Sequence, residues 1–252
     1  MKHLYWLDDK GWAKIEPLLP KGRRGAHRVD DRRVISGIIH MLRTGARWRD
    51  CPAAYGPYTT IYNRYHRWSQ QGVWFAIFEA LTGQSGVWGG AGAIDATHIK
   101  AHRSAAGAKG GTSQSIGRSR GGRTTKIHAL TDAAGRPRVL LLSPGNVNDG
   151  TMAIALVAAA GPLRHLMADR AYDANALRAW LADRGTQAVI PSTRSRKVAI
   201  PHDCDLYRQR NRIERMFCRL KDFRRVATRY DKLARNYAAA VHIAAFVAYW
   251  LN

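Results

Sequence analysis

The hydrophobic pattern of the sequence changes once, between residues 82 and 93, and this change limits the folds open to the chain. Before it, apolar residues recur at helical spacing, as in Arg32 to Thr44, which is followed by Gly45 as a stop signal. After it, short runs of strand length alternate with helical runs. The segment between them, Thr82 to Gly92, is rich in Gly and Ser and predicts a linker. We therefore expect a helical domain, a linker and an α/β domain, at residues 1–82, 83–92 and 93–252.

The α/β part has the element order strand, strand, strand, helix, strand, helix, strand, helix. This order is typical of a ribonuclease-H-like fold, in which helices flank a mixed five-stranded sheet. Helices are expected at 149–160 and 173–184, and one long helix is expected from Leu206 almost to the end of the chain. The predicted strands are 93–101, 126–131, 138–142, 165–168 and 187–191.

The N-terminal part contains three short helices with a Gly56-Pro57 turn before the last of them, which resembles a helix-turn-helix. In that arrangement the last helix, 59–71, packs Ile61, Tyr65 and Trp68 inward. The residues expected to face the major groove of DNA are Thr60, Asn63, Arg64 and Arg67. A plain helical bundle with basic surface residues explains the same pattern equally well.

Charge points to a polyanionic partner. The chain has 41 Lys and Arg against 18 Asp and Glu, a formal net charge of +23. Such a surplus is usually tolerated because a polyanion neutralises it, so nucleic acid is the leading candidate and an anionic membrane surface the rival. From Ala96 to Thr131 there are seven Lys or Arg and no acid, and a predicted loop at 103–123 fits a DNA backbone. The candidate phosphate contacts there are Arg118, Arg120, Arg123 and Lys126. A solvated loop without a partner is the alternative.

The remaining composition favours a bacterial cytoplasmic protein associated with the nucleoid. The first twelve residues lack the apolar run of a secretory signal. The most apolar stretch, Ala238 to Leu251, is too short to cross a bilayer, so a buried helix is expected and no membrane partner. Three widely spaced cysteines indicate reduced thiols rather than a metal site.

Two aspartates lie in apolar surroundings, where an unpaired charge is costly. Asp95 lies inside the first predicted strand. Asp169 follows the strand 165–168, at the carboxyl end of a strand, where open sheets bind their ligands. Converging carboxylates are what two-metal phosphoryl transfer needs. A loop residue or helix cap is the alternative for Asp169. Asp173 and Asp149 fit helix caps better.

A third acid, Glu214, comes from the predicted C-terminal helix. At about 100° per residue, Tyr207, Arg210, Glu214 and Lys221 fall within about 60° of one another. One acid flanked by cationic side chains on a single helix face suits the binding of metal and phosphate together. The alternative is a surface Glu in weak local ion pairs with Arg210 and Arg215.

These residues carry a resemblance to a known family. The spacing Tyr207-x2-Arg210-x3-Glu214-x6-Lys221 resembles the Y-R-E-K pattern of DDE-type bacterial insertion-sequence transposases, and further phrases are similar to the insertion-sequence-five family. The phrases are Arg43-Thr-Gly-Ala-Arg-Trp-Arg-Asp50, Ala101-His-Arg-Ser-Ala-Ala-Gly-Ala-Lys109, Gly117-Arg-Ser-Arg-Gly-Gly122, Thr125-Lys-Ile-His128 and Ala227-Thr-Arg-Tyr-Asp-Lys232.

The resemblance implies a ribonuclease-H-like core behind a helical DNA-binding segment. It maps the three catalytic, metal-binding acids onto Asp95, Asp169 and Glu214. Tyr207, Arg210 and Lys221 would contact DNA near the scissile phosphate. The implied cofactor is Mg²⁺ or Mn²⁺, with two ions. The implied partners are double-stranded DNA, namely terminal inverted repeats and target DNA, and further copies of the chain in a dimer or larger assembly.

Other functions fit parts of the sequence. A nuclease or resolvase on the same fold would cut without joining, and a DNA-binding regulator would use only the N-terminal helices. A zinc enzyme using His98 and His102 lacks cysteine partners, and both histidines fit polar strand and loop positions better. Tyrosine recombination lacks the Arg and His cluster that it needs around a late nucleophilic Tyr.

Overall fold

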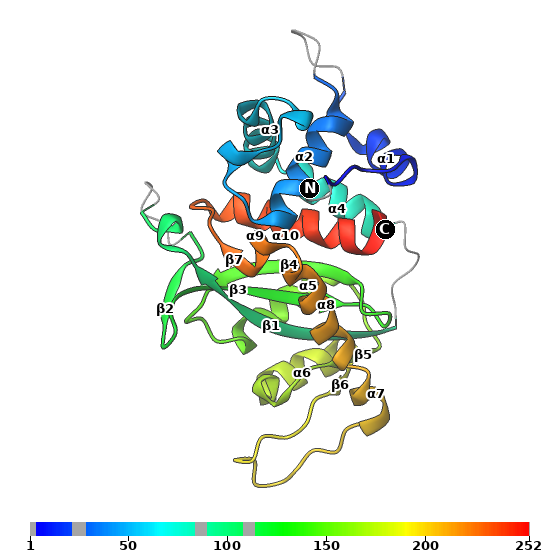
Figure 1. The fold of residues 1–252 in the computed structure, drawn as a ribbon. Helices are drawn as coiled ribbons and strands as arrows, with labels where there is room; N and C mark the ends of the chain where they lie inside the picture. Colours follow the sequence, from blue (N-terminus) through cyan, green and yellow to red (C-terminus); the bar gives the residue numbers. More distant parts are fainter. Residues whose placement is uncertain (1–3, 22–28, 84–89, 108–113, 252) are drawn as a thin grey trace. The chain divides into compact units, whose positions relative to one another are not determined.

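A computed structural model describes residues 4–21, 29–83, 90–107 and 114–251. The chain forms two compact units (Figure 1). The first contains Met1–Ser85, Ala101–Gln114 and Arg219–Asn252, and the second contains Gly86–Lys100 and Ser115–Cys218. The expected boundaries did not anticipate that the last 34 residues cluster with the N-terminal helices. Most of the predicted linker 83–92 and part of the predicted loop 103–123 lie outside the described residues.

The first unit is almost wholly helical. Its long C-terminal helix packs against three of the N-terminal helices, α2, α3 and α4. Its elements are α1 (Asp9–Ile15), η1 (Glu16–Leu18), α2 (Asp31–Thr44), η2 (Trp48–Asp50), η3 (Ala53–Tyr55), α3 (Tyr58–Gln70), α4 (Val73–Gly83), η4 (Arg103–Ala105), α9 (Arg224–Ala227), β7 (Thr228–Arg229), α10 (Ala234–Phe246) and η6 (Val247–Leu251).

Helix α2 shows how local sequence sets these elements. The Asp30 side chain accepts a hydrogen bond from the backbone N–H of Arg33 and so caps the first turn. The helix ends where Gly45 adopts a φ of 74°, a left-handed conformation that favours glycine. A Cβ at Gly45 would lie 2.8 Å from the Cβ of Arg224, so packing also requires glycine there. The predicted stop signal is confirmed.

Helix α3 packs as the sequence predicts for a helix-turn-helix, with Ile61, Tyr65 and Trp68 at most 3% exposed. The buried hydroxyl of Tyr65 donates to the backbone carbonyl of Asn236, and this bond joins α3 to the C-terminal helix of the same unit. The apolar stretch that begins at Ala238 is a buried helix, as expected. No helix in the described ranges is long and apolar enough to span a bilayer.

The second unit is built on a mixed sheet. Its strand order is β2-β3-β1-β5-β6, with β4 also paired to β3. β1 runs antiparallel to β3 and parallel to β5, and β5 runs parallel to β6. The elements are β1 (Ala91–Ala101), β2 (Gly117–Ser119), β3 (Gly122–Thr131), β4 (Pro137–Pro144), α5 (Gly150–Ala160), β5 (His165–Met167), η5 (Arg170–Tyr172), α6 (Asn175–Asp183), β6 (Gln187–Val189), α7 (Cys204–Arg208) and α8 (Asn211–Lys221).

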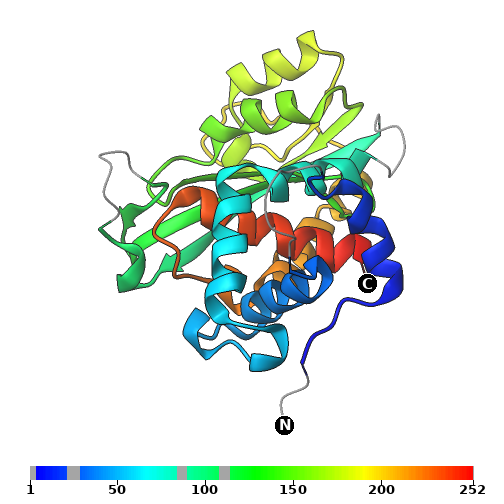
Figure 2. The same cartoon turned by 90° about the horizontal axis from the view of Figure 1, so that it is seen from above.

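Apolar side chains from one face of this sheet form the core of the second unit. Ile94, Leu130 and Leu166 are fully buried and pack with Leu156 of α5 and Leu181 of α6. Helices α5 and α6 lie on one side of the sheet and α8 on the other (Figure 2). All five predicted strands form, and the mixed sheet with flanking helices agrees with the predicted fold class.

The C-terminal region differs from the prediction of a single helix. Bonds of the i to i−3 type at residues 209–213 separate α7 from α8, and α8 ends at Lys221. The two predicted caps differ from the structure: Asp149 occupies the N-cap position of α5 but its side chain makes no capping bond, and the N-cap of α6 is Ala174 rather than Asp173. Both aspartates instead enter ion pairs, as described below.

Candidate active site

Strand register brings Asp95 and Asp169 together. Ala93 of β1 is paired with Met167 of the parallel strand β5. Asp95 lies two residues beyond this pair within β1, and Asp169 lies two residues beyond it, just after β5 ends and still in an extended conformation. The alternation of extended backbone therefore puts the two side chains level and on the same face. That face is opposite to the one that carries Ile94 and the core. This register is compatible with the expectation that the two carboxylates converge at the carboxyl ends of β1 and β5.

Backbone N–H groups hold both carboxylates in place. Asp95 Oδ1 accepts from the N–H of Ala96 (2.8 Å), and Asp169 Oδ1 accepts from the N–H of Ala171 (2.9 Å). Burial raises the pKa of Asp95 and outweighs the opposite effects of the Ala96 N–H and the Arg210 charge, while the charge of Asp169 raises it further. A carboxylate in this environment is stabilised by an added cation.

Arg210 connects Asp95 with Glu214. Its guanidinium lies 3.0 Å from Asp95 Oδ2 and 2.5 Å from Glu214 Oε1. Burial alone would lower the Arg210 pKa, but the charges of Asp95, Tyr207 and Glu214 outweigh burial and raise it. Glu214 and Arg210 thus form the local ion pair that was the alternative role for Glu214. The same Arg210 guanidinium also pairs with Asp95 of β1.

The donor chemistry fits hard divalent cations, because Asp95, Asp169 and Glu214 offer carboxylate oxygens only. In the described part of the chain no three His, Cys, Asp or Glu side chains are close enough to hold one ion together. The Arg210 guanidinium supplies a positive charge next to Asp95 and Glu214. The alternative zinc pair does not form a site either, since His98 contacts the carbonyl of Gly145 and His102 contacts Ser104.

Tyr207 and Lys221, the other two residues expected to act with Arg210 and Glu214, lie in different units. The Arg210 guanidinium lies over the Tyr207 ring, 5.8 Å from its centroid, and Tyr207 also packs edge-on against His202. Lys221 is the last residue of α8 and belongs to the first unit. Tyr207 lies in α7 and Glu214 in α8, so the predicted shared helix face is built from two short helices.

The other candidate DNA contacts divide into exposed and paired residues. Arg118, Arg120 and Arg123 are exposed in and beside the β2–β3 hairpin. In α3, Asn63 and Arg67 are exposed. The side chains of the other two predicted contacts, Arg64 and Lys126, are mostly buried within the protein.

Arg64 is mostly buried: its side chain is 10% exposed, forms an ion pair with Asp31 and lies over the Trp68 ring at 4.9 Å. Sequence spacing could place Arg64 on the outer part of α3 but could not show that Asp31 of α2 lies beside it. Of the three candidate contacts in α3, Asn63 and Arg67 are the exposed ones.

Lys126 is also buried, and its partners were not predicted from the sequence. It is 6% exposed, with its ammonium 2.9 Å from Asp149 Oδ1 and 2.7 Å from the carbonyl of Val147. His128 lies beside it at 0% exposure, with Nδ1 3.8 Å from Asp149 and Nε2 2.7 Å from Ser143 Oγ. This network ties strand β3 to the start of α5, where a plain helix cap was expected.

His128 predicts a loss of stability in mild acid. Burial lowers the His128 pKa to about 4, against the opposing charge of Asp149. Because the unfolded chain takes up this proton near pH 6.5 and the folded chain does not, stability falls as pH drops from 6.5 towards 4. We expect about 2 kcal/mol less stability at pH 5 than at pH 7 from this group. Urea unfolding at both pH values measures it, and His128→Gln should show a smaller difference; an unchanged difference would contradict this assignment.

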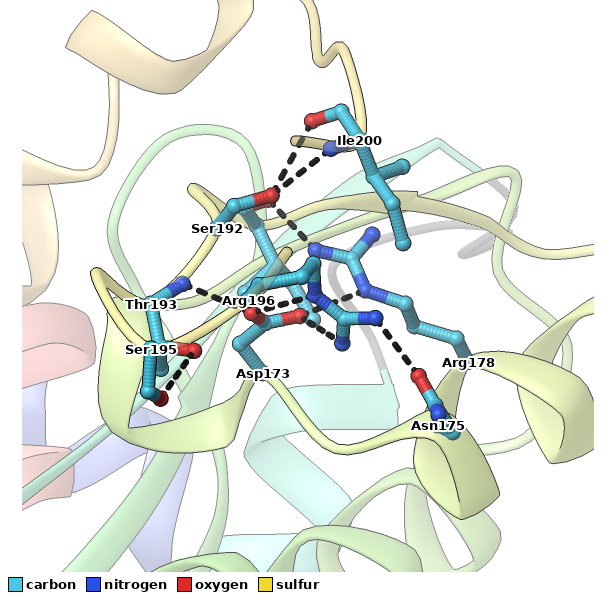
Figure 3. A network of polar contacts seen from close by, with 9 residues as sticks. Asp173, Asn175, Arg178, Ser192, Thr193, Ser195, Arg196 and Ile200 are labelled. Atoms are coloured by element: carbon cyan, nitrogen blue, oxygen red, sulfur yellow. Dashed lines mark hydrogen bonds and ion pairs between the residues drawn. The ribbon is translucent and has the colours of Figure 1, made fainter. Parts of the chain in front are cut away.

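Asp173 forms the centre of a second buried network (Figure 3). Its carboxylate, 0% exposed, pairs with Arg178 and Arg196, each at 2.8 Å, and accepts from the N–H of Thr193. The hydrogen bond from Arg196 is the main reason that the Asp173 pKa lies well below its usual range. Asp173 therefore anchors the segment after β6 and is fully engaged, unlike Asp169.

Comparison with known protein families shows to which family the chain belongs. A model described as "Transposase DDE domain" matches residues 89–251, about two thirds of the chain. A second model, "Putative transposase of IS4/5 family", matches residues 7–78. The chain belongs to the DDE transposase family. It is therefore an enzyme of the class that cuts and transfers DNA, and the ribonuclease-H-like fold expected from the element order is the fold of this family.

Two individual relatives are also described as putative transposases of insertion sequence elements. The chain is 37% identical over 132 residues to a "Putative transposase for insertion sequence element IS6501" of Brucella ovis, covering 51% of this chain and 99% of the relative. It is 33% identical over 137 residues to a "Putative transposase for insertion sequence element IS402" of Burkholderia cepacia, covering 50% of this chain and 63% of the relative. Transposases of this family generally use divalent metal ions.

Proposed function

We propose that this DDE transposase binds the terminal inverted repeats of its own insertion sequence, cleaves DNA at the element ends and transfers the resulting 3′-hydroxyl strands to target DNA. The observation that carries the proposal is the position of Arg210, which pairs with Asp95 and with Glu214, beside the strand register that relates Asp95 to Asp169. Asp95, Asp169 and Glu214 are proposed as the catalytic, metal-binding residues.

Two Mg²⁺ or Mn²⁺ ions bound by these carboxylates would lower the pKa of the attacking water or hydroxyl and stabilise the leaving oxygen. The protein itself contributes position and charge. Backbone N–H groups fix one oxygen of Asp95 and one of Asp169, which leaves the other oxygen of Asp169 open to a ligand. Arg210 balances the negative charge of Asp95 and Glu214 before DNA arrives, and is then placed to contact a phosphate.

DNA would be held by residues around this site and by helix α3. Tyr207, Arg210 and Lys221 are proposed to contact the strand near the scissile phosphate. The exposed arginines at 118, 120 and 123 and the exposed side chains of Asn63 and Arg67 are proposed to bind the backbone and the repeat. A dimer or larger assembly would pair the two element ends. The expected location is the bacterial cytoplasm, at the nucleoid.

The strand-transfer step separates this proposal from a nuclease or resolvase. Pre-cleaved element ends with a free 3′-hydroxyl are incubated with plasmid and Mg²⁺, and the products are separated on a gel. We expect plasmid joined to the ends, and none when the ends carry a 3′-dideoxy terminus. Cleavage of intact ends without joining of pre-cleaved ends would favour a nuclease, and neither activity would favour a DNA-binding regulator.

A further inference from the structure

The first unit contains a cavity of about 750 Å³ that the acidic site does not use. It lies among η2, α3, the residues after η4 and the segment from Arg225 to Asn236. Its volume is within the range of small-molecule and cofactor sites. All of the residues that line it belong to this one unit.

Aromatic rings form much of the cavity wall. Trp48, Tyr58, Tyr62 and Tyr230 all line it. Tyr58 and Tyr62 are 45% and 36% exposed, which is high for side chains of this size, and the Trp48 and Tyr62 rings lie 5.5 Å apart. Exposed rings that face a cavity offer stacking surfaces to a flat, unsaturated ligand.

Buried polar groups form the rest of the wall. Arg225 is 6% exposed, with its guanidinium over the Trp48 ring at 5.0 Å and the Tyr230 ring at 5.5 Å. One of its N–H groups donates to the carbonyl of Ala46. Asp231 is 7% exposed, and burial raises its pKa. Charged side chains are rarely buried to this extent unless they have a partner or a ligand.

Four of these wall residues keep one buried polar atom that has no hydrogen-bond partner among the described residues. Two are donors, Trp48 Nε1 and Arg225 Nε, and two are acceptors, Asp231 Oδ2 and Asn236 Oδ1. Unsatisfied buried groups are uncommon in folded proteins. Four of them in residues of one cavity wall indicate hydrogen-bonding capacity that the described part of the protein leaves unused.

We infer that this cavity receives an unpaired nucleobase of a DNA strand. A nucleobase is flat, so it stacks on aromatic rings, and its edge carries both donors and acceptors. Lys232, an exposed cation that also lines the cavity, suits the phosphate attached to such a base. An apolar ligand would leave all four wall atoms unsatisfied. The inference rests on the proposed DNA-processing function, in which strands are separated and rejoined.

The test compares two DNA duplexes of the same sequence, one fully paired and one with a single extra unpaired nucleotide. Binding is measured by fluorescence anisotropy at one fixed salt concentration, because phosphate contacts depend strongly on salt. We expect the wild-type protein to bind the bulged duplex at least about fivefold more tightly, as stacking on one aromatic side chain provides. Tyr62→Ala should remove this preference and Tyr62→Phe should keep it.

Phe75→Ala is the matched control. Phe75 is an exposed aromatic residue (46%) of the same unit that does not line the cavity, so this variant should retain the preference. Equal binding of both duplexes by the wild-type protein, or an unchanged preference in Tyr62→Ala, would overturn the inference. Failure of the proposed function would appear elsewhere, as absence of joined products in the strand-transfer assay.

Discussion

Replacing Asp95 with asparagine is expected to abolish strand cleavage and leave DNA binding intact. Asparagine keeps the size of the side chain and can still accept from the Ala96 N–H, but it removes the charge that attracts a divalent cation. We expect cleavage of end-containing DNA to slow by at least about 1,000-fold, equivalent to about 4 kcal/mol of transition-state stabilisation. Single-turnover cleavage with Mg²⁺ measures the rate, and mobility shifts in Ca²⁺ measure binding.

Asp205→Asn is the matched control for this change. Asp205 is an acid of the neighbouring helix α7 with an 87% exposed side chain, and it pairs with Arg208 in the same turn. Its loss should leave cleavage close to the wild-type rate. Cleavage by Asp95→Asn at a rate similar to that of this control would remove Asp95 from the proposed catalytic residues.

Replacing Asp173 with asparagine is expected to destabilise the protein. The carboxylate is 0% exposed and neutralises Arg178 and Arg196, whose side chains are only 12% and 17% exposed. Asparagine would leave two partly buried guanidinium groups without a counterion, and we expect a loss of about 3 kcal/mol in the free energy of unfolding at pH 7. Urea unfolding measures this value.

The pH dependence of that loss distinguishes a charge effect from a packing effect. Because the Asp173 pKa is lower in the folded chain than in the unfolded chain, its contribution is present above pH 4–5 and is lost as pH falls further. The difference between wild type and Asp173→Asn should therefore shrink in acid. A difference that is constant from pH 7 to pH 3, or no difference at pH 7, would contradict the role assigned to this carboxylate.

Sequence patterns predicted five of the strands because each of these five has a local signal. Alternation or an apolar run marks every predicted strand, and the hairpin turn at Gly135 has a φ of 80°, which its glycine favours. Two short strands, β2 and β7, were not predicted. They contain three and two residues, too few to show any periodicity.

The candidate site was predictable where one helical spacing or one strand register places the residues. The pair Arg210 and Glu214 follows from a spacing of four residues, and the break between α7 and α8 did not disturb it. The partners Asp31 of Arg64, Val147 of Lys126 and Thr193 of Asp173 lie at sequence distances of 20 to 33 residues and depend on tertiary packing. A single sequence carries no signal for such contacts, so two predicted DNA contacts lie buried in the protein instead.

The cavity in the first unit could not be predicted from the sequence either. Asp231 and Lys232 belong to a phrase that resembles the insertion-sequence-five family, but neither was assigned a role. Their meeting with Tyr62 joins segments about 170 residues apart. Only the packing of the C-terminal segment against the N-terminal helices of the same unit creates that surface.

The central claim is that Asp95, Asp169 and Glu214 act as one catalytic unit. The most direct test is the Mg²⁺-dependent cleavage rate of Asp95→Asn, Asp169→Asn and Glu214→Gln, measured beside Asp205→Asn and beside a double variant of Asp95 and Asp169. Residues that act as a unit are strongly non-additive, so each single variant should lose nearly all activity and the double variant should lose little more. Near-wild-type cleavage by any one of the three single variants would contradict the claim.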